Sequence, residues 1–121
     1  MSKEAFKNYV VRDLLGHLPN ITARAIFGGY GIYQDRYFFA VIVGDELFFK
    51  VDDSNRADYQ ASGSHPWTYR GGNKQVTMGY WLLPEAILEN PAEVGEWVTK
   101  SVAVAKSKKS KNLDSKPAIK K

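Results

Sequence analysis

The chain has 121 residues, of which 44% are hydrophobic and 13% aromatic, enough apolar material for one globular core and a single domain. The absence of cysteine excludes disulfides, zinc sites built on thiolates and a thiol nucleophile. The net charge of +4 is unevenly divided, because residues 106–121 hold seven lysines and one aspartate and carry +6, which leaves −2 on residues 1–105.

No targeting or anchoring segment is expected. The first residues are polar, and the longest apolar run, residues 37–43, is too short to span a bilayer or to follow the basic region of a signal peptide. We therefore expect a cytoplasmic protein.

The opening segment predicts an amphipathic helix. Ser2 is its candidate N-cap, and the helix ends at Leu18-Pro19-Asn20. Its apolar residues recur at three- and four-residue spacing, and they are Phe6, Tyr9, Val10, Leu14 and Leu18. Short runs rich in aromatic and β-branched residues follow, separated by glycine or polar turns, and predict three or four antiparallel strands. These runs cover residues 23–27, 32–33, 37–43 and 47–51.

A second helix is predicted over residues 56–62, because Asp52-Asp53-Ser54-Asn55 is rich in capping residues and Gly63 suits a helix C-terminus. Residues 67–69 and 75–81 then flank a glycine-rich turn and predict a hairpin that extends the same sheet. A third helix begins with Asn90 as its cap, Pro91 in its first turn and Glu93 at capping-box spacing.

These elements predict an α+β domain over residues 1–105, with an antiparallel β-sheet of about five to six strands and helices packed on it. The predicted order is helix, three or four strands, helix, two strands, helix. Residues 106–121 are rich in lysine and serine and poor in apolar side chains, so we expect a disordered lysine-rich tail. The expected core includes Leu14, Phe27, Trp97 and Val98.

Arg24-Ala25-Ile26-Phe27-Gly28-Gly29-Tyr30-Gly31-Ile32-Tyr33 resembles the signature of the TfoX N-terminal domain family, and the resemblance extends over roughly residues 5–105. A Lys-Val-Asp block at residues 50–52 and a Tyr-Trp-x-x-Pro block at residues 80–84 follow in the family's order. Further matching positions are Phe39-Ala40-Val41-Ile42, Asn55, Tyr59, Gly63, Pro66-Trp67-Thr68-Tyr69, Leu88 and Trp97.

The resemblance implies a fold similar to that of secretion chaperones and a bacterial role in competence and transcription regulation. It also implies a regulatory binding domain that is not an enzyme and needs no cofactor. The expected partner is a protein that is itself a transcription regulator. The similarity to secretion chaperones further suggests a homodimer. Longer family members carry a second, helical domain, and we expect this chain to hold the N-terminal domain only.

The glycine cluster at residues 28–31 does not predict a phosphate-binding loop. Such a loop runs from a strand into a helix, whereas this cluster lies between two predicted strands and lacks the Gly-Lys-Ser/Thr ending, so a bulge or tight reversal is favoured. Asp52 and Asp53 are interpreted as capping residues rather than metal ligands. Neither His17 nor His65 lies in a catalytic or metal-binding motif, so we predict no catalytic residue and no metal site.

Aromatic side chains interleaved with cations on the predicted strands suggest a surface on which nucleic-acid bases stack, although packing within the sheet is the favoured explanation of the aromatics. The aromatics are Tyr30, Tyr33, Tyr37, Tyr69, Tyr80 and Trp81, and the cations are Arg24, Arg36, Lys50 and Arg70. The lysine tail suits nonspecific contact with DNA, and a solvated tail that only aids solubility is the equally weighted alternative.

Three functions follow in order of preference. The first is a regulatory domain that binds a protein partner, with the tail assisting contact to DNA. The second is a nucleic-acid-binding protein that uses its basic tail and aromatic sheet, and the third is an enzyme acting on a small molecule near Arg24, Lys50 and the Asp52-Asp53 turn. The predicted partner contacts are Arg24, Tyr30, Lys50 and Tyr80, and the predicted nucleic-acid contacts are Lys106, Lys108, Lys109 and Lys111.

Overall fold

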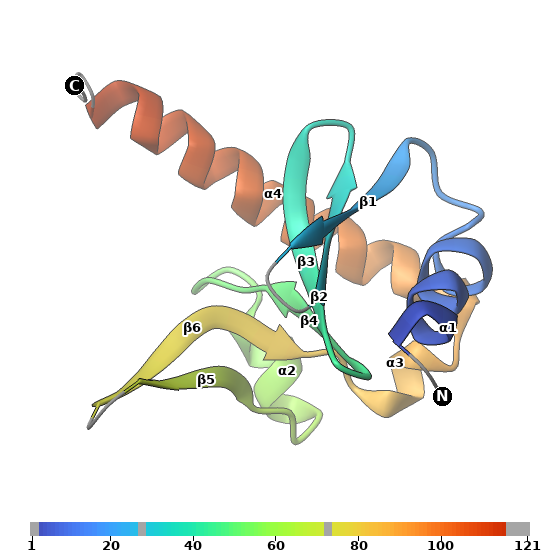
Figure 1. Cartoon of the computed structure of the whole chain (residues 1–121). Helices are drawn as coiled ribbons and strands as arrows, with labels where there is room; N and C mark the ends of the chain where they lie inside the picture. The colour runs from blue at the N-terminus through green and yellow to red at the C-terminus, as the bar shows by residue number, and fades with distance from the viewer. Residues whose placement is uncertain (1–2, 27–28, 72–73, 116–121) are drawn as a thin grey trace.

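The computed structural model describes residues 3–26, 29–71 and 74–115, which form one antiparallel sheet and several helices (Figure 1). The strands lie in the spatial order β1-β2-β3-β4-β6-β5. In chain order the elements are α1 (Lys3–Asn8), the π-helix η1 (Tyr9–Leu14), β1 (Ile21–Ile26), β2 (Gly29–Gln34), β3 (Tyr37–Val43), β4 (Glu46–Lys50), α2 (Arg56–Ala61), β5 (Pro66–Gly71), β6 (Lys74–Leu82), α3 (Glu85–Leu88) and α4 (Pro91–Ser115). The predicted α+β class and element order are confirmed, and the short α3 is additional.

A β-bulge in β3 decides which aromatic side chains face the helices. Ile32 of β2 lies opposite Ala40, but the next residue, Tyr33, lies opposite Phe38, so Phe39 is the extra residue. Because side chains otherwise alternate between the faces of a strand, the bulge directs both Phe39 and Ala40 into the core and leaves Phe38 on the other face. Phe39 and Ala40 are both 0% exposed.

The core lies between the sheet and the helices. Figure 1 shows α4 crossing the sheet at β3, and buried valines of α4 share one apolar cluster with Phe39, Ile42 and Phe49. The predicted core positions Leu14 and Val98 are buried, and Trp97 is partly buried against the same cluster. Phe27 lies outside the described residues.

Two of the helix ends predicted from special residues are confirmed, while Ser2 lies outside the described residues. At the start of α4, the Asn90 side-chain oxygen accepts a hydrogen bond from the Ala92 N–H at 3.2 Å, and the Asn90 amide donates to the Glu93 carboxylate at 2.8 Å. After α2, Gly63 adopts a left-handed conformation with φ of +76°, which glycine tolerates best.

The first helical segment ends earlier than predicted. η1 closes at Leu14, and the Leu15 N–H donates to the Val10 carbonyl at 2.9 Å, five residues back. Beyond this end, Gly16 approaches the Arg12 carbonyl so closely that a Cβ there would lie 2.0 Å from its oxygen. His17 therefore lies in the turn beyond the helix.

The last helix extends further than predicted. α4 continues to Ser115, ten residues past Ala105, so residues 106–115 are helical where the sequence predicted disorder. Extending an existing helix avoids the unfavourable nucleation step, and lysine is a good helix former. Residues 116–121 lie outside the described part of the chain, and the division into a domain and a tail stays a prediction. No helix within the described ranges has the length and apolar character needed to cross a membrane.

Two glycine substitutions are expected to change stability in opposite directions. In Gly29→Ala the new Cβ would lie 1.9 Å from the Ile42 carbonyl oxygen, so β2 and β3 must separate locally and the free energy of unfolding should fall by roughly 2 kcal/mol or more. In Gly95→Ala the methyl group meets only the Leu18 side chain, at 3.7 Å, inside a helix. We expect this variant to be about 0.5–1 kcal/mol more stable. Urea unfolding of both variants checks the prediction, and destabilisation by Gly95→Ala would contradict it.

Candidate functional site

The face of the sheet that the helices leave uncovered carries the candidate site, here called the helix-free face. Residues that pair directly across antiparallel strands point to the same face. Tyr33 pairs with Phe38 and Lys50 pairs with Tyr80, while Phe49 beside Lys50 points into the core. The described side chains that define the helix-free face are Arg24, Tyr33, Phe38, Phe48, Lys50, Trp67 and Tyr80.

Aromatic rings form a continuous series across this face. Tyr33 stacks on Phe38 with ring centroids 5.1 Å apart, and Phe38 lies 6.0 Å from Tyr80. Trp67 lies 6.4 Å from Tyr80 and 5.8 Å from Phe48. These separations are typical of favourable aromatic pairs, so each ring holds the orientation of the next.

Gly31 makes room for this series. It lies on the helix-free face opposite Val41, and a Cβ at Gly31 would lie 3.0 Å from the Phe38 ring. Gly29 in turn lies against the Ile42 backbone. Gly29 and Gly31 thus have a structural role, but it is close packing within a regular part of β2 and not the predicted bulge or tight reversal, because the register shift falls between Ile32 and Tyr33. Gly28 lies outside the described residues.

Two cations lie over the rings. The Lys50 ammonium is 5.3 Å from the Phe38 centroid and 5.6 Å from that of Tyr80. The Arg24 guanidinium is 5.9 Å from the Tyr33 centroid. Cations at such distances are attracted by the ring faces, so the positive charge is held beside apolar surface.

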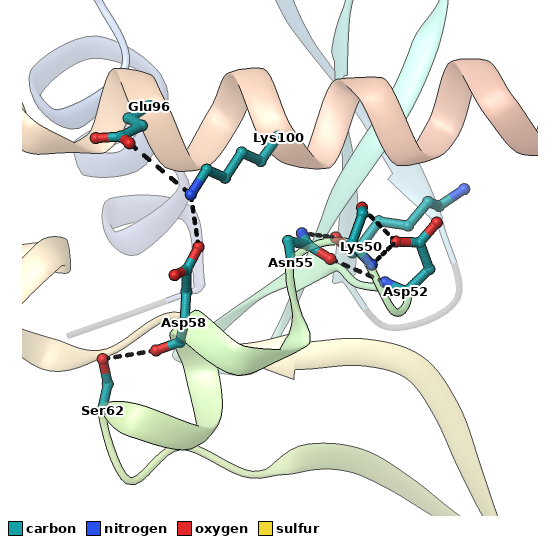
Figure 2. A network of polar contacts seen from close by, with 8 residues as sticks. Lys50, Asp52, Asn55, Asp58, Ser62, Glu96 and Lys100 are labelled. Atoms are coloured by element: carbon teal, nitrogen blue, oxygen red, sulfur yellow. Dashed lines mark hydrogen bonds and ion pairs between the residues drawn. The ribbon is translucent and has the colours of Figure 1, made fainter.

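The backbone beneath Lys50 is fixed from the helix side. Its carbonyl oxygen accepts hydrogen bonds from the Ser101 hydroxyl of α4 at 2.9 Å and from the Asn55 side-chain amide at 3.2 Å. Figure 2 shows the Asn55 contact together with the bond from the Asp52 N–H to the Asn55 side-chain oxygen, which is 2.9 Å long. Asn55 is 2% exposed, so these bonds satisfy a buried polar group and fix the end of β4.

The acidic turn acts structurally, but the predicted capping by Asp52 and Asp53 is wrong, because the N-cap of α2 is Asn55, whose own side chain makes no capping hydrogen bond to the described helix. The Asp52 carboxylate accepts from the Ser54 N–H at 2.8 Å, and Asp53 forms an ion pair with Arg56. Figure 2 also shows Lys100 between Asp58 and Glu96, and the hydrogen bond to Asp58 raises the pKa of the Lys100 ammonium. Among the described residues no group of histidine and carboxylate side chains is arranged to hold a metal ion.

Three of the four predicted partner contacts lie on one face. Arg24, Lys50 and Tyr80 all belong to the helix-free face, whereas Tyr30 pairs with the buried Ile42 and lies under the Lys7 ammonium at 5.5 Å on the helix side. Lys106 also lies on the helix side, with its ammonium 5.3 Å from the Tyr37 ring. Lys108, Lys109 and Lys111 belong to α4 by their backbone, and their side chains are outside the described set.

The aromatic surface in the structure contains different residues from those that the sequence suggested. Tyr37 and Trp81 pack against the helix-side core, while Phe38, Phe48 and Trp67 complete the series with Tyr33 and Tyr80. The sequence did not predict Phe38, Phe48 and Trp67 as members of this surface. Their positions depend on the bulge at Phe39 and on the pairing of β4 with β6, which joins strands that are far apart in the sequence.

The fold and this face define a small α+β domain whose distinctive surface is a sheet of aromatic and cationic side chains. Sequence comparison identifies the family. The family model of the TfoX N-terminal domain matches residues 13–105, and the chain belongs to that family. Protein Sxy of Escherichia coli (strain K12) is 28% identical over 83 residues, which are 68% of this chain and 39% of that protein. The chain thus spans less than half the length of this relative.

The phenol of Tyr80 gives the site a measurable signature. Burial, followed by the nearby Tyr33 phenol, raises the pKa of Tyr80 from 10.0 to about 12. Between these two pH values the Tyr80 phenol loses its proton in the unfolded chain but keeps it in the folded chain. This group therefore leaves the free energy of unfolding unchanged below pH 10 and lowers it as the pH rises towards 12. Tyr80→Phe should remove part of this fall in urea unfolding measured at increasing pH. Equal pH dependence in the variant and the parent would contradict the assignment.

Proposed function

We propose that this chain is a non-enzymatic regulatory domain, similar to the N-terminal domain of the competence regulator TfoX, that acts in transcription regulation by binding a protein partner. The proposal places the partner on the helix-free face and the protein in the cytoplasm. The continuous series of rings flanked by Arg24 and Lys50 is the observation that carries it.

The chemistry of this face suits a protein surface. Tyrosine, tryptophan, phenylalanine and arginine are enriched at protein interfaces, where large rings exclude water and cations contribute hydrogen bonds at the edge. Tyr33, Phe38, Trp67 and Tyr80 are all half-buried and restrained by their neighbours, so binding would cost little side-chain entropy. The net charge of −2 on residues 1–105 disfavours a polyanion over the folded part as a whole.

Site-specific photocrosslinking tests the proposal. A benzophenone amino acid placed at Tyr33 is expected to crosslink a specific protein in the cells of origin, because that ring lies on the helix-free face. The matched control is Tyr37, also a half-buried tyrosine but on the helix side. The crosslinked protein should bind the purified chain, and Lys50→Met should weaken that binding about tenfold, a typical loss for one charged contact.

Equal crosslinking from both tyrosines, or none from Tyr33, would overturn the assignment of this face. Lys100→Met serves as a second control in the binding measurement, because Lys100 lies on the helix side and pairs with Asp58. A partner whose affinity falls equally in the Lys50 and Lys100 variants would bind elsewhere.

A second candidate function is nucleic-acid binding, and the helical continuation of α4 is the observation that favours it. Residues 106–115 extend the helix beyond the sheet, as Figure 1 shows, and carry Lys106, Lys108, Lys109 and Lys111 along it. Clustered lysines on a helix support salt-dependent, sequence-independent contact with phosphates.

Fluorescence anisotropy of duplex and single-stranded DNA separates the two candidates. We expect the full chain to bind weakly at low salt and a version ending at Ala105 to lose that binding, since each phosphate contact contributes through counterion release. Binding that survives both truncation and physiological salt would instead assign nucleic-acid recognition to the aromatic sheet.

A further inference from the structure

β1 is an edge strand with an accessible outer side. Within the described residues it pairs only with β2, and every residue from Ile21 to Ile26 keeps regular register with that strand. Thr22, Arg24 and Ala25 are exposed, and Ile26, at 37%, is the one exposed large hydrophobic residue in the described part of the chain. Alternate residues of an edge strand direct their backbone N–H and C=O groups away from the sheet, so such an edge is a template for another strand.

The opposite edge of the sheet is protected, whereas β1 is not. β5 begins with Pro66, which has no N–H to donate, and its register with β6 shifts between Pro66 and Thr68. Proline and irregular register are devices by which proteins block strand addition at an edge. β1 contains neither, and its only charged residue is Arg24.

We propose that β1 pairs antiparallel with β1 of a second copy of this chain, forming a symmetric dimer with a continuous sheet. The strand is suited to a copy of itself, because its central residues, Thr22 to Ala25, are small apart from Arg24. A two-fold axis perpendicular to the sheet makes both copies contribute the same surface.

Face alternation and charge select the register. The two-fold axis keeps the helices of both copies on the same side of the continuous sheet. Residues that pair across the new contact must then come from the same face of β1, so the axis passes through one residue position, which pairs with itself in the second copy. Centring on Arg24 would place two guanidinium groups directly opposite each other, which is unfavourable. A centre at Thr22 or Ala25 would pair only residues 21–23 or 24–26 of the strand. Centring on Ala23 pairs residues 21–25 and places Thr22 opposite Arg24 of the second copy, and this is the register we propose.

This pairing has a consequence for the candidate site. Arg24 lies on the helix-free face, over Tyr33, and in the dimer both copies present this face on the same side. The two aromatic series then form one larger surface. Because the strand has only six residues, the contact is small and the dimer should be weak, with a dissociation constant on the order of 100 µM.

Sedimentation of the full chain over about 10 to 500 µM tests association directly. Thr22 is exposed and can be changed without disturbing the core. Thr22→Lys places a cation opposite Arg24 twice in each dimer and should weaken association about tenfold, whereas Thr22→Glu should strengthen it by a similar factor. A chain that stays monomeric at the highest concentration overturns the proposal.

Single cysteines test the register, since the native chain has none. Ala23→Cys should form a disulfide-linked dimer on mild oxidation, because opposite Cα atoms in an antiparallel pair lie about 4.5–5.5 Å apart, within disulfide range. The matched control is Ala25→Cys, two residues along the same face, which should crosslink at least tenfold more slowly. Association that Thr22→Lys and Thr22→Glu leave unchanged, or faster crosslinking at residue 25, would show that the proposed pairing is wrong.

Discussion

The β-bulge at Phe39 is the constraint on which both layers of this domain depend. Without an extra residue, the strict alternation of β3 would place Phe38 on the same side as Ala40 and Ile42, among the helices. With it, Phe39 packs edge-on against Phe49 in the core, at 5.4 Å between centroids, while Phe38 takes its position between Tyr33 and Tyr80. One irregularity in one strand thus fills the core and aligns the aromatic series on the other face.

The two faces are also linked through Lys50. Its main-chain oxygen is held on the helix side by Ser101 and Asn55, and its ammonium lies over Phe38 and Tyr80 on the opposite side. Since Asn55 and Ser101 are buried, losing either side chain would leave a polar group without its partner inside the protein. The position of the cation therefore depends on the docking of α4, although α4 does not touch the helix-free face itself.

Most of the fold was predictable from sequence because its signals are local. Asn90, Pro91 and Glu93 specify the start of α4, and Gly63 specifies the turn after α2, through their own backbone chemistry. The early end of the first helical segment was not predictable, because the apolar spacing in the sequence continues to Leu18 although η1 closes at Leu14. The helical continuation past Ala105 was missed because composition alone underestimates how readily an established helix extends.

The candidate site was predicted only in part, and the reason is again geometric. Arg24, Lys50 and Tyr80 were identified by chemical type, but nothing in the alternation of β2 distinguishes Tyr30 from Tyr33 as members of a site until the buried face is known. Phe38 was hidden by the bulge, and Trp67 comes near Phe48 because β6 pairs with both β4 and β5 and so joins β5 to the same sheet. Residue type can be read along the chain, whereas membership of a face depends on register.

The distribution of charge along α4 favours separate sites for the two proposed contacts, the helix-free face for a protein and the C-terminal part of α4 for a polyanion. Glu93 lies in the first turn of α4, where an acidic side chain complements the helix dipole, and Lys100 and Lys106 follow in the middle of the helix. Lys100 pairs with Asp58 and the Lys106 ammonium lies over the Tyr37 ring, whereas Lys108, Lys109 and Lys111 belong by their backbone to the part of α4 that follows. The proposed contact with a polyanion therefore falls on this part of α4. Because that face combines half-buried rings with only a few cations, its chemistry is better matched to another protein surface than to a chain of phosphates.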